Sequence, residues 1–230
     1  MRHELSEDID KYLRWLERSN DITGCLDRHK ITPALRARMV DWMIEVLTNF
    51  RCDDQTFFLA TSLQDRYFKH CSSPKEISDL HIVGVTSMFI ASKFEDIYPL
   101  KMKTVHEKIA HKKLEIEIIK SLELDMMKSI DYKIHAPTVL DFLKVYLLEV
   151  LGIEILNRTE TKKKEVLALG NAMPPTNEEA KDSQMDEEPK EEKKPDLRTP
   201  AEKEHDVEQY LIEKMAIYLA KMSMHDLNLA

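Results

Sequence analysis

Residues 80–97 read LHIVGVTSMFIASKFEDI and form the most hydrophobic helical candidate in the chain. Its apolar side chains point in nearly all directions on a helical wheel, which predicts a helix that is buried on most sides. The β-branched residues would also suit a strand, but the length of the segment and its helical neighbours favour a helix. Tyr98-Pro99 is expected to end it, because the residue before a proline is disfavoured in the α conformation. The segment therefore predicts the central helix of an all-α fold.

Amphipathic segments with apolar residues at three- and four-residue spacing lie on both sides of this helix. The first covers residues 9–16. Pro33 begins the second, because its fixed φ suits the first helical turn, and Asp53 and Asp54 offer an N-cap for the third. Two more follow the central helix, through residues 105–109 and 114–130. Together they predict a compact bundle wrapped around one hydrophobic helix.

The chain changes character after residue 135. A helix is expected to begin at Pro137, and another to run from about residue 207 to residue 222. Residues 157–205 contain charged runs and prolines but no aromatic residue, so they bury too little apolar area to offset chain entropy and are predicted to be disordered. We therefore expect an N-terminal helix in residues 1–20, a first fold in 21–135, a helix in 136–156, the charged insert in 157–205 and a last helix in 206–230.

Composition limits the classes of function. Only 4 of the 230 residues are glycine, whereas phosphate loops and dinucleotide turns need glycine for positive φ. A formal net charge of -8 disfavours a broad nucleic-acid interface. The cysteines Cys25, Cys52 and Cys71 lack zinc-like spacing, which predicts reduced thiols in the cytosol or nucleus. No run approaches 18 apolar residues, and the N-terminus is polar, so neither a membrane span nor a secretory signal is expected.

No group of residues predicts catalysis, a metal or a cofactor. On a helix, His106 and His111 would lie about 140° apart, too far round to share a zinc ion as an i, i+4 pair does. Lys93 lies near the end of the hydrophobic helix. It is either a surface lysine lying along apolar atoms or a cation placed to complement the helix dipole. Arg36 and Asp65 each interrupt an apolar face, and could be solvated or form a buried pair.

The segment LRARMVDWMIEV at residues 35–46 resembles the opening helix of the cyclin box in mitotic A/B-type cyclins. Other motifs agree in order and spacing, namely EDI at 7–9, LQDRYF at 63–68, ASKFEDIYP at 91–99 and APT at 136–138. The ordered set covers about residues 5–150, and it is far more specific than one motif alone. The resemblance implies a five-helix cyclin box, preceded by an N-terminal helix, that binds a cyclin-dependent Ser/Thr protein kinase and holds it active.

The resemblance also implies roles for particular residues. Lys93 and Glu123 match the lysine and glutamate that hydrogen-bond the kinase near its mobile αC helix. Leu5 and Ile9 match positions on the N-terminal helix that touch the kinase, and Tyr132 stands where the family packs a phenylalanine against αC. The implied function is a non-catalytic regulatory subunit that controls the G2/M cell cycle as a heterodimer with the kinase. It would act in the nucleus and cytoplasm, without a cofactor, nucleic acid or membrane.

Further positions match the family or depart from it. Arg36 and Asp65 match an internal ion pair that fixes the box, and such a pair is strongly destabilised when one partner is removed. The family's docking patch for Arg-x-Leu motifs matches Leu35, Arg38, Met39 and Trp42. Position 38 is normally apolar in the family. An arginine there would repel a basic docking motif, so docking of substrates or inhibitors is expected to be weakened or altered.

The second cyclin fold of the family is expected to be incomplete. The helix from Thr138 matches its first helix, MAIYLAKMS at 215–223 resembles its second, and the charged insert lies between them. Thr199-Pro200 in the insert resembles a proline-directed phosphorylation site. Two other classes of function stay open: a cyclin-box scaffold or transcription-associated protein that binds other proteins, and a helical enzyme unrelated to kinases.

Overall fold

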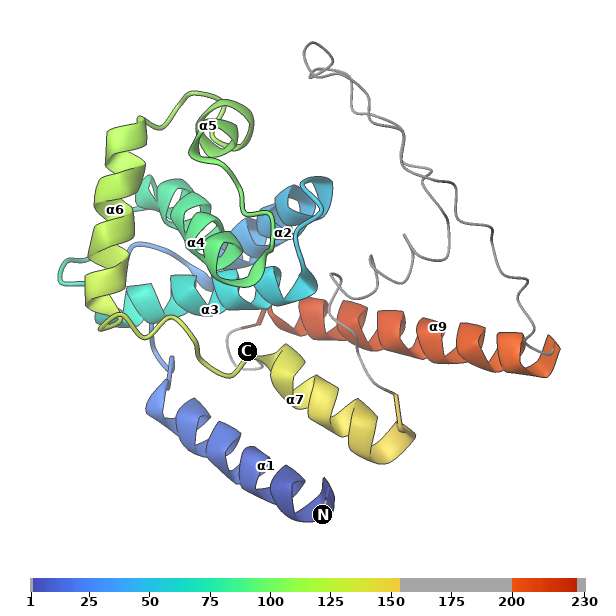
Figure 1. Cartoon of the computed structure of the whole chain (residues 1–230). Coiled ribbons are helices and arrows are strands. Elements are labelled where there is room, and N and C mark those ends of the chain that lie inside the picture. The colour runs from blue at the N-terminus through green and yellow to red at the C-terminus, as the bar shows by residue number, and fades with distance from the viewer. Residues whose placement is uncertain (1, 154–199, 227–230) are drawn as a thin grey trace, which may run out of the picture.

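The computed structural model describes residues 2–153 and 200–226, and all regular secondary structure in that part of the chain is helical (Figure 1). The N-terminal part contains α1 (Arg2–Ser19), α2 (Pro33–Asn49), α3 (Asp54–His70), α4 (Asp79–Glu95) and α6 (Ile116–Ser129). The short α5 (Met102–Thr104) continues as the π-helical turn η1 (Val105–Ile109), and α7 (Val139–Tyr146) continues as η2 (Leu147–Leu151). The last helix is α9 (Pro200–Ser223). The predicted all-α class is confirmed.

Helix α4 is the centre of the bundle and packs against α2, α3, η1 and α6 (Figure 1). Most of its side chains are buried, including Val83, Met88 and Ile90, as the sequence predicts. Gly84 allows α2 to approach closely, because a Cβ at that position would lie 1.8 Å from the Cε atom of Met39. The side chain of Met39 therefore occupies the space that Gly84 leaves open.

Local signals explain where the first bundle helices begin. Pro33 is at the first position of α2, and the Thr32 hydroxyl accepts a hydrogen bond from the Leu35 amide at 3.3 Å. The Asp53 carboxylate likewise accepts from the Gln55 amide at 2.9 Å and caps α3. The predicted starts of α2 and α3 are therefore confirmed.

Three predicted helix boundaries, those of α4, α7 and α9, need correction. Helix α4 ends at Glu95, before Tyr98-Pro99, and the chain then turns back so that the Leu100 amide donates to the Ser92 hydroxyl at 2.9 Å. Helix α7 begins at Val139 rather than at Pro137, because the Asp141 carboxylate accepts from both the backbone and the hydroxyl of Thr138.

Helix α9 begins at Pro200 rather than near residue 207, so the last part of the predicted disordered segment is helical. The fixed φ of proline suits the first turn of a helix. The rest of that segment, residues 157–199, lies outside the described part of the chain.

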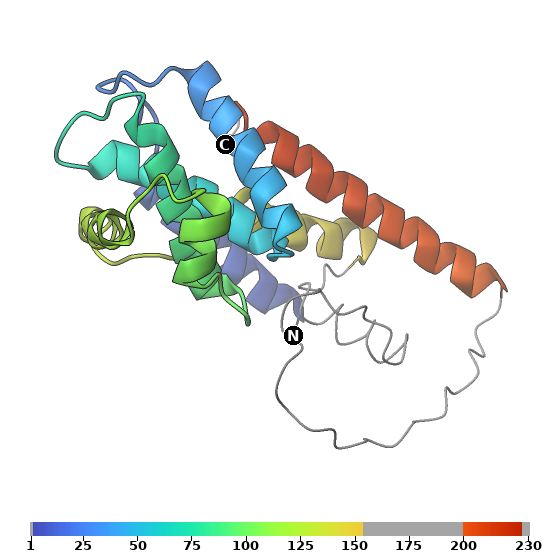
Figure 2. The same ribbon diagram turned by 90° about the horizontal axis from the view of Figure 1, so that it is seen from above.

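The end of α9 docks on the bundle beside α2 and α7 (Figure 2). Ile217, Ala220 and Met224 are buried there, and the Lys221 ammonium lies 2.6 Å from an Asp54 carboxylate oxygen of α3. No described helix is long and apolar enough to cross a membrane. Two segments far apart in the sequence therefore form one packed body.

Candidate functional site

Lys93 and Glu123 form an ion pair with each other at the surface of the bundle. Lys93 lies in the last turn of α4 and Glu123 lies on α6. Their side chains are 40% and 24% exposed, and the Lys93 ammonium stands 4.3 Å from the centre of the Phe89 ring. The charged end of the lysine thus lies over an aromatic ring and beside a carboxylate while it stays partly open to solvent. Two residues that the resemblance relates to one partner therefore lie side by side.

Exposed apolar side chains surround the end of α4. Phe94 is 48% exposed, Ile97 63% and Tyr98 91%, and the Phe94 ring stacks on His135 with the ring centres 6.5 Å apart. Clustered apolar side chains of this size are typical of a surface that binds another protein. None of these three residues was expected in the site from the sequence. The run FEDIY directly after Lys93 could have indicated them, because it places large apolar residues where the helix was expected to end.

Tyr132 lies in the loop after α6 and is exposed. Its φ is +57°, and its amide donates to the Met127 carbonyl at 2.8 Å, which ends the helix. Arg66 of α3 fixes the same loop, because its guanidinium donates to the carbonyl of Ile134 at 3.0 Å and to that of Lys133. Burial lowers the pKa of Arg66 to about 10, below its usual value. The loop that carries Tyr132 is therefore rigidly held by the core.

The N-terminal helix presents an exposed apolar face. Ile9 is exposed, and Tyr12 and Trp15 stack on each other with ring centres 6.0 Å apart. The side chain of Leu5 lies outside the described part of the chain, as does Thr199. The structure thus places Ile9 at the surface, whereas the kinase contact of Leu5 and the phosphorylation of Thr199 stay predictions.

Arg36 and Asp65 form a buried ion pair, and both side chains are 0% exposed. The Arg36 guanidinium donates from Nε to one carboxylate oxygen at 2.7 Å and from an Nη atom to the other at 2.5 Å. Its remaining Nη atom donates to the Met224 carbonyl at 2.6 Å. Burial raises the pKa of the Asp65 carboxyl, and the hydrogen bonds from Arg36 oppose that rise. The pair therefore joins α2, α3 and the end of α9.

The predicted docking patch is only partly a surface feature. Arg38 is exposed, Leu35 is half-buried, and Trp42 is half-buried against His81, with the ring centres 5.1 Å apart. Met39 is buried in the space beside Gly84. Of the four predicted residues, Met39 belongs to the core, because its position on α2 faces α4.

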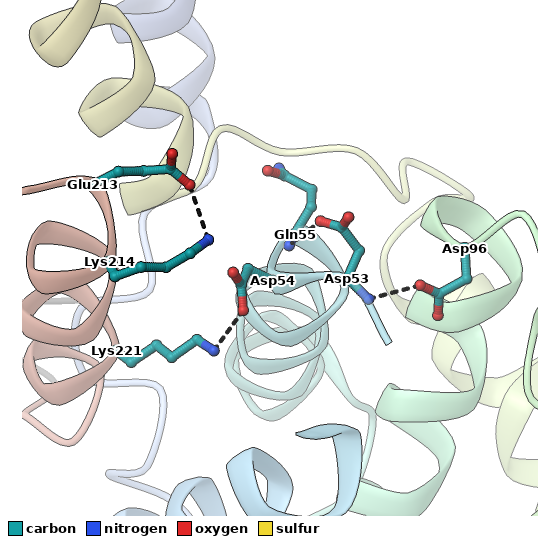
Figure 3. A network of polar contacts seen from close by, with 7 residues as sticks. All are labelled: Asp53, Asp54, Gln55, Asp96, Glu213, Lys214 and Lys221. Atoms are coloured by element: carbon teal, nitrogen blue, oxygen red, sulfur yellow. Dashed lines mark hydrogen bonds and ion pairs between the residues drawn. The ribbon is translucent and has the colours of Figure 1, made fainter. Parts of the chain in front are cut away.

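A polar network at the start of α3 fixes the end of α4 (Figure 3). The Asp53 amide donates to an Asp96 carboxylate oxygen at 2.9 Å, and Asp54 pairs with Lys221 of α9. Burial raises the pKa of the neighbouring Glu95, and the charge of Asp141 adds to the rise. Within residues 2–153 and 200–226, no group of histidine, cysteine or acidic side chains is arranged to hold a metal ion. The network therefore has a positioning role for the helix that carries Lys93.

A bundle around one buried helix, with a charged pair and apolar side chains at its surface, defines an all-helical fold with a candidate protein-binding surface. The sequence model for "Cyclin, N-terminal domain" matches residues 8–135, so the chain belongs to the cyclin family.

Three relatives show the range of similarity. G2/mitotic-specific cyclin-B1 of Oryzias luzonensis is 30% identical over 142 residues, which are 61% of this chain and 35% of the relative. G2/mitotic-specific cyclin-B of Arbacia punctulata is 36% identical over 146 residues, 61% of this chain and 34% of the relative. The corresponding protein of Marthasterias glacialis is 31% identical over 144 residues, 61% of this chain and 36% of the relative. The chain thus spans about a third of the length of these relatives, and the predicted resemblance to mitotic cyclins is confirmed.

Proposed function

We propose that this chain is a regulatory subunit that binds a cyclin-dependent Ser/Thr protein kinase and stabilises its active conformation. The observation that carries the proposal is the Lys93–Glu123 pair at the surface, directly beside Phe94, Ile97 and Tyr98. A polar pair next to exposed apolar side chains has the composition of a protein interface, with hydrogen-bonding groups beside an apolar centre. The names of the relatives, G2/mitotic-specific cyclins, support a role at the G2/M stage.

The pair is suited to exchange its partners. An ion pair between partly exposed side chains contributes only about 0–1 kcal/mol, because water screens the charges. Lys93 and Glu123 can therefore turn from each other toward hydrogen-bonding groups of a kinase at little cost. Once binding excludes water from the interface, the hydrogen bonds that Lys93 and Glu123 make to the kinase strengthen, because water no longer competes with them.

Activation then follows from differential affinity. If the surface around Lys93 fits the kinase better when the αC helix is turned inward, binding shifts the population toward that state. In that state the glutamate of αC pairs with the β3 lysine, as phosphoryl transfer requires. The cyclin chain supplies no reacting group, and its contribution is a rigid surface. The Asp53–Asp96 contact and the Arg66 contacts hold the two parts of that surface in place.

A kinase assay tests the proposal. Purified cyclin-dependent kinase catalytic subunits are assayed with and without the chain, using histone as the phosphate acceptor. We expect the chain to raise the rate. At a subsaturating concentration, Lys93→Ala with Glu123→Ala should lower that activation about thirtyfold or more, because interface anchors of this kind contribute about 2 kcal/mol or more.

Glu117 and Lys120 provide the matched control, since they form an exposed ion pair at 3.0 Å on the same helix α6. Glu117→Ala with Lys120→Ala should leave the activation unchanged. Equal activation by both double variants, each with the helical content of the parent chain, would contradict the proposal.

A further inference from the structure

A groove of about 1340 Å³, whose lining includes neither Lys93 nor Glu123, lies where the end of α1 and the loop after it, the start of α2, the start of α7 and the end of α9 meet. Its apolar lining includes Phe58 from the core, Val139 and Phe142 of α7, and Met222 of α9. The volume exceeds the range of about 300–1,000 Å³ that is typical of small-molecule pockets. The groove is therefore large enough for several side chains of a peptide segment.

Acidic side chains surround the apolar floor. Glu17, Asp21, Asp27 and Asp226 line the groove, and Arg18 is the only lysine or arginine among the lining residues. Hydrogen bonds from the hydroxyl and amide of Thr23 lower the pKa of Asp21, which keeps its carboxylate ionised.

Two other titratable groups, Asp65 and His225, also line the groove. Asp65 is neutralised by Arg36, and His225 lies 2.6 Å from Asp41. The rim consequently carries an excess of negative charge from the acidic side chains around the floor.

The walls of the groove are held in place by contacts from several elements. Gly24 has a φ of +67°, and a Cβ there would lie 2.5 Å from Oδ2 of Asp27, so the loop favours glycine at this point. Lys69 of α3 donates to the Thr23 carbonyl, and Arg36 holds the Met224 carbonyl at 2.6 Å. A groove that is already formed needs little ordering when it binds a ligand.

We propose that this groove is a docking site for a cationic amphipathic segment of a partner protein. Aliphatic side chains of the segment would cover the floor formed by Val139, Phe142 and Met222, and its lysine or arginine side chains would meet the carboxylates of the rim. Nucleic acid and phosphorylated segments carry the wrong charge for this rim. The lining includes neither Lys93 nor Glu123, so the docking proposal does not depend on the part that this pair plays in kinase binding.

Fluorescence anisotropy with the full chain tests the site directly. The probe is a short labelled peptide in which single arginine and leucine residues alternate, so that it contains no Arg-x-Leu motif. The comparison peptide has glutamate in place of every arginine. We expect the arginine peptide to bind, its affinity to fall as salt is added, and the glutamate peptide not to bind, because exposed charges are screened by salt.

Two variants separate the groove from general charge attraction. Glu17→Gln with Asp27→Asn should weaken binding about threefold to tenfold, as expected for the loss of two partly exposed ion pairs. The matched control, Glu115→Gln with Glu117→Gln at the exposed start of α6, makes the same change in net charge and should leave binding unchanged. Ala34→Trp, at an exposed alanine that lines the groove, fills the space without removing a core side chain and should abolish binding.

Several results would overturn the proposal. Equal weakening by the rim variant and the α6 control would indicate non-specific attraction, and unchanged binding to a folded Ala34→Trp chain would place the peptide elsewhere. Self-association that the rim variant abolishes, seen by analytical ultracentrifugation, would assign the groove to a second copy of the chain. Binding that requires removal of residues 227–230 would assign it to the chain's own tail.

Discussion

The bundle formed by α2 to α6 and the C-terminal helix α9 obtain their stability in different ways. In the bundle, large apolar side chains such as Phe58, Met43 and Met88 are 0% exposed. On α9, only one face near its end is buried, at Ile217, Ala220 and Met224. The opposite face is apolar but exposed, and its residues are Val207, Leu211, Met215, Tyr218, Leu219 and Met222. The bundle has a complete core, whereas α9 is attached at one end.

Charged contacts make that attachment specific. The end of α9 is held by Arg36 through the Met224 carbonyl, by Asp54 through Lys221, and by Asp41 through His225. Hydrogen bonds to charged groups contribute about 1.5–3 kcal/mol when they are shielded from water, and less when they are exposed. The position of α9, which buries little apolar surface, therefore depends on a few polar contacts, whereas the stability of the bundle depends on packing.

The largest effect is expected at the point where the two regions meet. Asp65→Ala leaves the buried Arg36 guanidinium without its partner and should lower the free energy of unfolding by about 3–5 kcal/mol. Urea unfolding followed by circular dichroism measures the change. Arg36→Met with Asp65→Leu, which removes both charges and keeps much of the volume, should recover a large part of the loss. No recovery in the double variant would show that the charge argument is wrong.

Packing predicts a contrast between core and exposed apolar residues. Phe58→Ala creates a cavity in the bundle and should destabilise the chain by about 3–5 kcal/mol. Leu211→Ala on α9, where the side chain is 59% exposed, should change the free energy of unfolding by no more than about 0.5 kcal/mol. Both values come from urea unfolding. A loss of several kcal/mol at Leu211 would mean that the exposed face of α9 is covered in solution.

A smaller effect is expected from the polar attachment of α9. Lys221→Ala removes the contact with Asp54 and should reduce stability by about 1 kcal/mol, because the pair is partly exposed. Hydrogen exchange should show faster exchange in α9 with unchanged protection in α4. Lys214→Ala is the control, since the described contacts of the Lys214 ammonium, with Glu213 and with the Tyr210 ring, are both to residues of α9 itself. Similar rates of hydrogen exchange in both variants would show that Lys221 does not attach α9 to the bundle.

The smallest effect concerns pH. Burial lowers the pKa of His81 on α4, and the nearby Lys113 and His111 add to the shift. Because its folded pKa lies below the unfolded value of about 6.5, the folded chain binds fewer protons. The stability that neutral His81 provides is therefore fully present above the unfolded pKa of about 6.5, and it is lost as the pH falls below that pKa.

Between pH 7 and pH 5.5 the loss due to His81 should stay below about 0.5 kcal/mol, because the ring is partly exposed. His81→Phe, which keeps an aromatic ring beside Trp42, should flatten this part of the pH profile. A profile that is identical in the parent chain and the variant would contradict the assignment.

Local features of the sequence were sufficient to predict much of the fold. Pro33 marks the start of α2, Asp53 caps α3, and the all-round hydrophobicity of residues 80–97 identifies the central helix. These signals are local, because each depends on a residue's conformational preference or on spacing along one helix. The predicted end at Tyr98-Pro99 failed because a tertiary contact, from Leu100 to Ser92, turns the chain earlier.

The contacts between distant residues could not be derived from such signals. Nothing in the spacing of Arg36 and Asp65 decides between solvation and a buried pair, and nothing indicates that Met224 accepts the third hydrogen bond. The burial of Met39 depends equally on the missing side chain of Gly84. For the candidate site, the resemblance pointed to Lys93 and Glu123, but their mutual ion pair requires α4 and α6 to be packed together.

Calorimetric titration of the chain into a purified cyclin-dependent kinase catalytic subunit tests the central claim most directly. The account predicts a stable complex whose dissociation constant rises about thirtyfold or more for Lys93→Ala with Glu123→Ala. It predicts an unchanged dissociation constant for the control Glu117→Ala with Lys120→Ala. The absence of a complex with any such kinase, or equal dissociation constants for the parent chain and the Lys93/Glu123 variant, would contradict it.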